Sequence, residues 1–234
     1  DDKIVAPARF TALTAYSPNA ANLKDDFDSV LDRIYLAYLK LPESNSLERY
    51  EELGKLLLRA NKVDPKAQYE LSDKYFRGDG VTFDDKLALK YMRMAAEQGY
   101  APAQAGMGNF YSLGLPVADQ YILHPMKIDA LEWFLKAANQ GYLEPVHGIV
   151  RLYQTGEGLV PQDRIAAYAW AEIARQASHP EAKDLLESAI DGEYLGKIKD
   201  GKIVYAKKMT SGQIAKGKAL AKEMIKKNPK LLKD

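Results

Sequence analysis

The residue types that most often carry catalysis or metal binding are scarce in this 234-residue chain. It has no cysteine, which excludes disulfides, thiol nucleophiles and thiolate metal sites. Its three histidines, His124, His147 and His179, are far apart in the sequence and lack metal-ligand spacing. No motif of a serine hydrolase, zinc protease, P-loop nucleotide-binding protein or EF-hand occurs. The sequence therefore predicts no catalytic, cofactor or metal site and indicates that the protein is not an enzyme.

Two glycine pairs, Gly78 with Gly80 and Gly156 with Gly158, could instead form phosphate-binding loops. They stand at equivalent places in a repeated pattern, which favours helix-ending turns over phosphate binding. The net charge of +1 argues against a dedicated nucleic-acid binder. No uncharged apolar run approaches the roughly 20 residues of a membrane helix, so no integral membrane segment is predicted.

An internal repeat over 66–99, 102–141 and 144–178 predicts the secondary structure of the middle of the chain. Each copy carries the same packing residues at equivalent positions. In the first half of each copy these are Ala67, Ala103 and Pro145; Leu71, Met107 and Ile149; and Tyr75, Tyr111 and Tyr153, followed by Gly78, Gly114 and Gly156. In the second half they are Ala88, Ala130 and Ala167, then Tyr91, Trp133 and Trp170. The identical placement of the last three favours core packing over a base- or sugar-stacking platform.

The spacing within one copy is that of two helices joined by a turn. Ala67, Leu71 and Tyr75 recur every four residues and form one apolar stripe along a first helix. Gly78 ends this helix, and Asp84 suits the start of the second. One helix pair cannot cover its own apolar face, so neighbouring pairs must stack. We therefore predict an all-α fold, an α/α superhelical solenoid of helix-turn-helix repeats.

These positions resemble the Sel-one-like repeat family, a relative of the tetratricopeptide repeat. The resemblance covers about half of the chain and shows departures, such as Ser72 at the first-helix glycine of the family pattern, where we expect looser helix contact. It implies a protein-binding role, with the first helices of the repeats lining a concave face. The predicted partner-binding residues on that face are Tyr69, Asp73, Phe76, Arg77, Asn109, Ser112, His147, Arg151 and Gln154.

The second copy is longer than the others, because a loop over 115–125 is inserted between its two helices. Insertions in helical repeats often serve binding, so Tyr121 and His124 are further candidates for partner contact. A loop length that is merely tolerated is the alternative interpretation.

The flanks suggest caps for the array. We predict an irregular segment over 1–24, a degenerate capping helix pair over 25–62, the three repeats over 63–178, and C-terminal capping helices with a basic tail over 179–234. An Asp-Gly pair between isoleucine-containing flanks predicts a short β-hairpin near 197–205. The basic tail is either a solvated face or a contact for an acidic partner or anionic lipid.

The resemblance implies a bacterial protein in the periplasm or outside the cell, with its signal peptide removed. Its partner would be another protein, either a secreted antibacterial effector of the type VI lipase kind, which the chain would neutralise as an immunity protein, or a subunit of an envelope complex that it would help to assemble or regulate. A β-lactam-binding or β-lactam-hydrolysing enzyme is the less favoured alternative, because the relatives with that association carry repeat-spaced cysteines and this chain has none.

Overall fold

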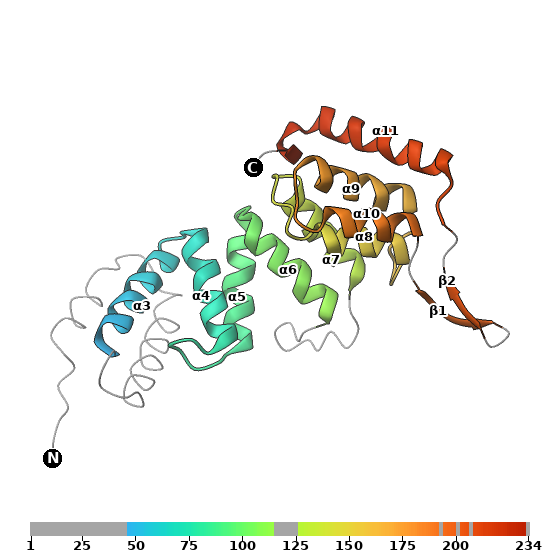
Figure 1. Cartoon of the computed structure of the whole chain (residues 1–234). Coiled ribbons are helices and arrows are strands. Elements are labelled where there is room, and N and C mark those ends of the chain that lie inside the picture. The colour runs from blue at the N-terminus through green and yellow to red at the C-terminus, as the bar shows by residue number, and fades with distance from the viewer. Residues whose placement is uncertain (1–45, 115–125, 192–193, 200–201, 206–207, 233–234) are drawn as a thin grey trace, which may run out of the picture. The chain divides into compact units, whose positions relative to one another are not determined.

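The computed structural model describes residues 46–114, 126–191, 194–199, 202–205 and 208–232 (Figure 1). The chain divides into two compact units. The N-terminal unit is Asp1–Ala88 and the C-terminal unit is Leu89–Asp234, so the boundary lies inside α5 (Asp85–Glu97). The first helix of the predicted capping pair and the loop residues Tyr121 and His124 lie outside the described residues. Each unit is considered separately below.

The N-terminal unit contains α3 (Ser46–Asn61) and α4 (Pro65–Arg77) packed against each other. The Asp64 side chain starts α4 by accepting hydrogen bonds from the backbone N–H groups of Lys66 and Ala67. Gly78 ends α4 in the left-handed conformation, with φ of 68°. The Ser72 hydroxyl is fully buried and donates a 2.6 Å hydrogen bond to the Ala88 carbonyl of α5. This bond joins the two helices at the position where looser contact was predicted.

The C-terminal unit stacks α6 (Ala101–Leu113), α7 (Lys127–Ala138), α8 (Val146–Thr155) and α9 (Arg164–Gln176) in chain order. The ring of Phe134 on α7 lies between α6 and α8 because both neighbours present a glycine to it. A Cβ built on Gly108 would lie 2.3 Å from the ring, and one on Gly148 would lie 2.7 Å from it. These glycines allow the close helix approach that the solenoid requires.

The predicted packing positions are confirmed as the core of both units. Ala67, Ala103, Leu71, Met107, Ile149, Ala88, Ala130 and Ala167 are all fully buried. The first-helix tyrosines differ, since Tyr75 is buried whereas Tyr111 and Tyr153 are half-buried. Trp133 is also half-buried, and the Lys136 ammonium lies 4.0 Å from the centre of its ring. The core prediction for Trp133 was thus only partly right.

The chain then closes against α9. α10 (Ala182–Asp191) packs on α9, and β1 (Tyr194–Lys199) pairs antiparallel with β2 (Lys202–Tyr205), which confirms the predicted hairpin. α11 (Ser211–Lys227) lies along the outside of α9 and is followed by a 3₁₀ helix, η1 (Pro229–Leu232) (Figure 1). The predicted capping box between Thr210 and Gln213 starts α11. The described part of the chain is an all-α solenoid with one hairpin.

Candidate functional site

The structure places the four predicted binding residues of the N-terminal unit on the exposed side of α4. Tyr69 and Asp73 are half-buried, whereas Phe76 and Arg77 are exposed, Phe76 by 45%. Arg77 Nε donates a 2.8 Å hydrogen bond to Asp73 Oδ1, and this bond raises the pKa of Arg77 above its ordinary value. Phe76 is therefore the exposed apolar residue of this group, with a salt bridge beside it on the same helix.

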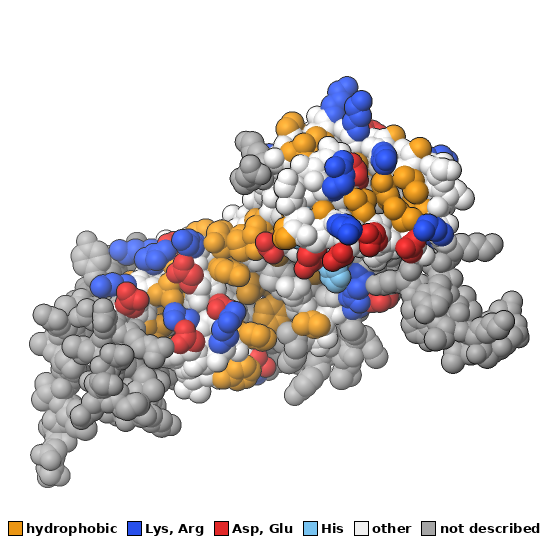
Figure 2. All heavy atoms as spheres, viewed as in Figure 1, with side chains coloured by type: hydrophobic (Ala, Val, Ile, Leu, Met, Phe, Trp, Pro, Cys, Tyr) orange, Lys and Arg blue, Asp and Glu red, His pale blue; other side chains and the backbone are white. Residues whose placement is uncertain are grey.

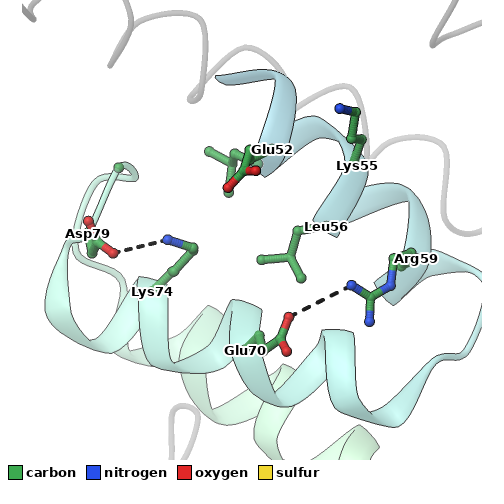
Figure 3. Close-up of a pocket in the computed structure, with 9 residues that line it drawn as sticks. Glu52, Lys55, Leu56, Arg59, Glu70, Lys74 and Asp79 are labelled. Atoms are coloured by element: carbon green, nitrogen blue, oxygen red, sulfur yellow. Dashed lines mark hydrogen bonds and ion pairs between the residues drawn. The ribbon is translucent and has the colours of Figure 1, made fainter. Parts of the chain in front are cut away.

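A groove of about 420 Å³ lies between α3 and α4 (Figure 3). Its apolar floor includes Leu53 and Leu56, which are 3% and 6% exposed. The remaining lining residues are Glu52, Lys55, Arg59, Glu70, Lys74, Asp79 and Gly80, so that cations and anions balance. Lys74 pairs with Asp79 at 3.0 Å and Arg59 with Glu70 at 3.9 Å. The predicted residues of α4 do not line this groove.

The structure brings three of the predicted residues together in a second groove, of about 300 Å³, between α8 and α10. His147, Arg151 and Gln154 line it from α8. Val150 and Leu185 form its buried apolar floor, at 1% and 3% exposed. We call this the α8–α10 groove, and its other lining residues are Glu181, Asp184 and Ser188.

The two walls of the α8–α10 groove carry opposite charge. Arg151, together with His147, lies on the α8 wall, and Glu181 and Asp184 lie exposed on the opposite wall. Figure 2 shows acidic side chains gathered beside α10. A ligand segment in this groove would meet an apolar floor with Arg151 on one side and two carboxylates on the other.

Gln154 fixes the end of the groove rather than lying free at its surface. It is 5% exposed, and its Nε2 lies 3.3 Å from Ser188 Oγ of α10. Its backbone carbonyl accepts a 2.6 Å hydrogen bond from Gln162 Nε2. These bonds join α8 to α10 and to the segment that precedes α9, so partly buried polar contacts hold the spacing of the walls.

Arg151 belongs to a charge network that sequence reasoning missed. Its Nη1 lies 3.6 Å from Glu157 Oε1, and its Nη2 lies 3.5 Å from the hydroxyl of Ser112, another predicted residue. Lys127 Nζ donates a 2.6 Å hydrogen bond to the Ser112 carbonyl and lies 3.6 Å from Glu157. Asn109, the remaining predicted residue of this unit, is exposed one turn before Ser112 on α6.

The α10 wall was also missed, because its segment was interpreted only as a capping helix. A sequence signal did exist, since Glu181, Asp184 and Ser188 recur at the three- and four-residue spacing of one helix face. This is the face that meets His147 and Arg151 across the groove.

The described residues contain neither a metal-ligand cluster nor a membrane-spanning helix. No group of three or more metal-ligating side chains comes together there. Within the same residues, no helix is both long enough and apolar enough to cross a bilayer.

Comparison with known proteins gives a consistent result. The family model for the Sel1 repeat matches residues 65–100, 101–142 and 147–179. An exopolysaccharide production negative regulator of Rhizobium leguminosarum is 31% identical over 53% of this chain and 49% of its own length. Chitin synthase regulatory factor 3 of Schizosaccharomyces pombe is 32% identical over 47% of this chain and 12% of its own length.

The chain thus spans about half of the Rhizobium protein and a small part of the yeast protein. Among solved structures, a Sel1 repeat protein from Oxalobacter formigenes is 34% identical, with a TM-score of 0.52, over 58% of this chain and 98% of its own. The matched repeats are those whose core positions and helix-ending glycines are described above. The chain therefore belongs to the Sel1 repeat family.

Proposed function

We propose that this chain is a non-catalytic binding module that holds a segment of a partner protein in the α8–α10 groove. Sel1 repeats mediate protein–protein interaction, and the combination of an apolar floor with oppositely charged walls supports this groove as the contact. A buried apolar side chain supplies affinity, whereas the charged walls select the sequence and orientation of the bound segment.

The chemistry of the walls defines the segment. An apolar side chain would lie on Val150 and Leu185, a basic side chain would face Glu181 and Asp184, and an acidic one would face Arg151. The groove is lined by eight residues, whereas each partner in a stable complex contributes roughly 20–30 residues to the interface. The partner must therefore also contact surface outside this groove, for which the inserted loop over 115–125 remains a candidate. Phe76 and Arg77 of the N-terminal unit remain a separate proposed contact.

The names of the relatives favour a regulatory role. The Rhizobium relative is a negative regulator of exopolysaccharide production, and the yeast relative is a chitin synthase regulatory factor. Both names concern the making of a polysaccharide. We propose by analogy that this chain is an adaptor or regulator of a bacterial envelope complex, acting in the periplasm.

Neutralisation of a secreted antibacterial effector is the more specific version of the same binding chemistry. It needs the groove to cover an active site or a membrane-facing surface of the effector by complementary area. The identity of the captured protein separates the two versions, because an envelope or polysaccharide enzyme supports regulation and a secreted lipase supports immunity.

The test is affinity capture from the native cells with the full chain as bait. A Glu181→Arg/Asp184→Arg bait reverses the acidic wall and is expected to lose the partner, since like charges then face its basic side chain. A Glu97→Arg/Glu132→Arg bait makes the same change in net charge at exposed positions outside the groove. The control bait should retain the partner; equal capture by all three baits would show that the groove is not the contact.

A further inference from the structure

The outer surface of α11 carries a concentration of lysines that the groove does not use. Lys216, Lys218, Lys222, Lys226 and Lys227 are exposed along α11, and Lys208 and Lys230 are exposed at its two ends. The single acidic residue of the helix is Glu223. Figure 2 shows basic side chains on the part of the C-terminal unit where α11 lies. We call this set of lysines the α11 lysine face.

Most of this charge is not neutralised within the protein. Lys208 pairs with Asp191 and Lys227 with Glu223, each at 2.6 Å. Among the described residues, the other five lysines have no carboxylate within ion-pair distance. A face with this excess of positive charge attracts an extended anionic surface.

The apolar side of α11 packs against the core of the C-terminal unit and is therefore not available to a ligand. Ala221 is fully buried, and Gly217 lies directly against the ring of Tyr168 on α9. Asn228 Nδ2 also donates a 2.8 Å hydrogen bond to the Asn139 carbonyl at the end of α7. Because the apolar residues are held by the core, α11 cannot turn them toward lipid, and any attraction must be electrostatic.

The residue types separate a lipid surface from a specific protein partner. Residues 206–234 contain no arginine and no aromatic residue. Protein interfaces are enriched in arginine, tyrosine and tryptophan and depleted in lysine. The outer ridge of the helix carries the small, exposed residues Ala215 and Ala219, so lysines from both flanks can reach one plane.

We propose that the α11 lysine face docks peripherally on the surface of an anionic lipid bilayer. This contact is separate from the α8–α10 groove and would bring a partner held there close to the membrane. Lysine-rich segments bind anionic bilayers through diffuse attraction, and each lysine near the surface multiplies the affinity about fivefold. The binding should therefore be reversed by salt and require no insertion.

The test is co-sedimentation of the full chain with vesicles of mixed phosphatidylglycerol and phosphatidylcholine at low ionic strength. A Lys218→Gln/Lys222→Gln/Lys226→Gln variant removes three charges, keeps polar side chains and a similar helix propensity, and should lose affinity on the order of a hundredfold. The matched control, Lys55→Gln/Lys66→Gln/Lys183→Gln, removes the same charge at exposed positions on other elements and should change affinity by less than about threefold.

Several results would overturn the proposal. These are no sedimentation of the wild type with the anionic vesicles, equal sedimentation with pure phosphatidylcholine, or an equal loss in the two triple variants. Tighter binding to a duplex DNA of random sequence than to the vesicles would also contradict it, because the lysine face would then bind nucleic-acid phosphates in preference to lipid. Circular dichroism of each variant confirms that the helices are intact.

Discussion

Replacing Gly108 by alanine should destabilise the C-terminal unit, although alanine favours helices over glycine. An ideal Cβ at this position would lie 2.3 Å from Cδ1 and 2.4 Å from Cε1 of Phe134, where ordinary contact begins at 3.4 Å. The ring would have to move by about 1 Å. It has no room on its far side, because a Cβ on Gly148 would lie only 2.7 Å from Cε2 of the same ring.

The magnitude follows from two opposing effects. Overpacking a close-packed core costs about 1–3 kcal/mol, and a ring held on both sides places the cost at the upper end. The gain from replacing glycine by alanine in a helix is about 1 kcal/mol. The net loss of unfolding free energy for Gly108→Ala is therefore about 2 kcal/mol, which corresponds to a fall in Tm of about 4–8 °C for a unit of this size.

Thermal unfolding followed by circular dichroism measures this effect, with Gly212→Ala as the control. A Cβ on Gly212 meets only Thr210 Oγ1, at 3.9 Å, so that variant should be as stable as the wild type or more stable. In a Phe134→Leu background, Gly108→Ala should cost little, because the smaller side chain leaves room. An unchanged or raised Tm for Gly108→Ala, or the same loss in both backgrounds, would refute the packing explanation.

Three other substitutions test the local chemistry. Glu172 is 5% exposed and accepts hydrogen bonds from Arg175 at 2.6 and 2.9 Å, and these bonds lower the pKa of Glu172. Glu172→Gln should therefore lower the unfolding free energy of the C-terminal unit by about 1–2 kcal/mol at neutral pH. Because the pKa is lowered in the folded state, this stabilisation disappears as the pH falls below the ordinary value of 4.5, and unfolding curves of wild type and variant should converge in acid. Val63 has φ of 67° and is 59% exposed, so Val63→Gly should stabilise the N-terminal unit by about 1 kcal/mol in urea unfolding, whereas a loss would show that its backbone is not strained. Ser72→Ala should cost about 1–2 kcal/mol in the same assay, since the Ala88 carbonyl loses a buried donor; no change would mean that water replaces the hydroxyl.

The repeat frame could be predicted from the sequence because its determinants are local and recur. A four-residue spacing places Ala67, Leu71 and Tyr75 on one face, whichever helix packs against it. The left-handed backbone at the end of α4 favours glycine, which is found there as Gly78. The same kind of local signal, an Asp-Gly pair in the sequence, predicted the hairpin that β1 and β2 form. These features depend on backbone geometry that the sequence expresses within a few residues.

The site was less predictable, because it depends on contacts between residues distant in sequence. The helical spacing predicted that His147, Arg151 and Gln154 share one face of a first helix. It did not predict that the acidic residues of the α10 wall lie opposite that face. The pairing of Arg151 with Glu157 likewise depends on how the turn after α8 folds back. Helix spacing predicts which residues share a face and does not predict which face lies across from it.

Site-specific photo-crosslinking in the native cells tests the central claim most directly. A photoreactive amino acid replaces His147, which is exposed at the α8–α10 groove, and in a second, otherwise identical strain it replaces Glu132, which is exposed on α7 outside the groove. We expect a discrete crosslinked protein from position 147 and none from position 132. A partner crosslinked only from position 132, or a partner captured by the wild-type chain that never crosslinks from position 147, would contradict binding in the α8–α10 groove.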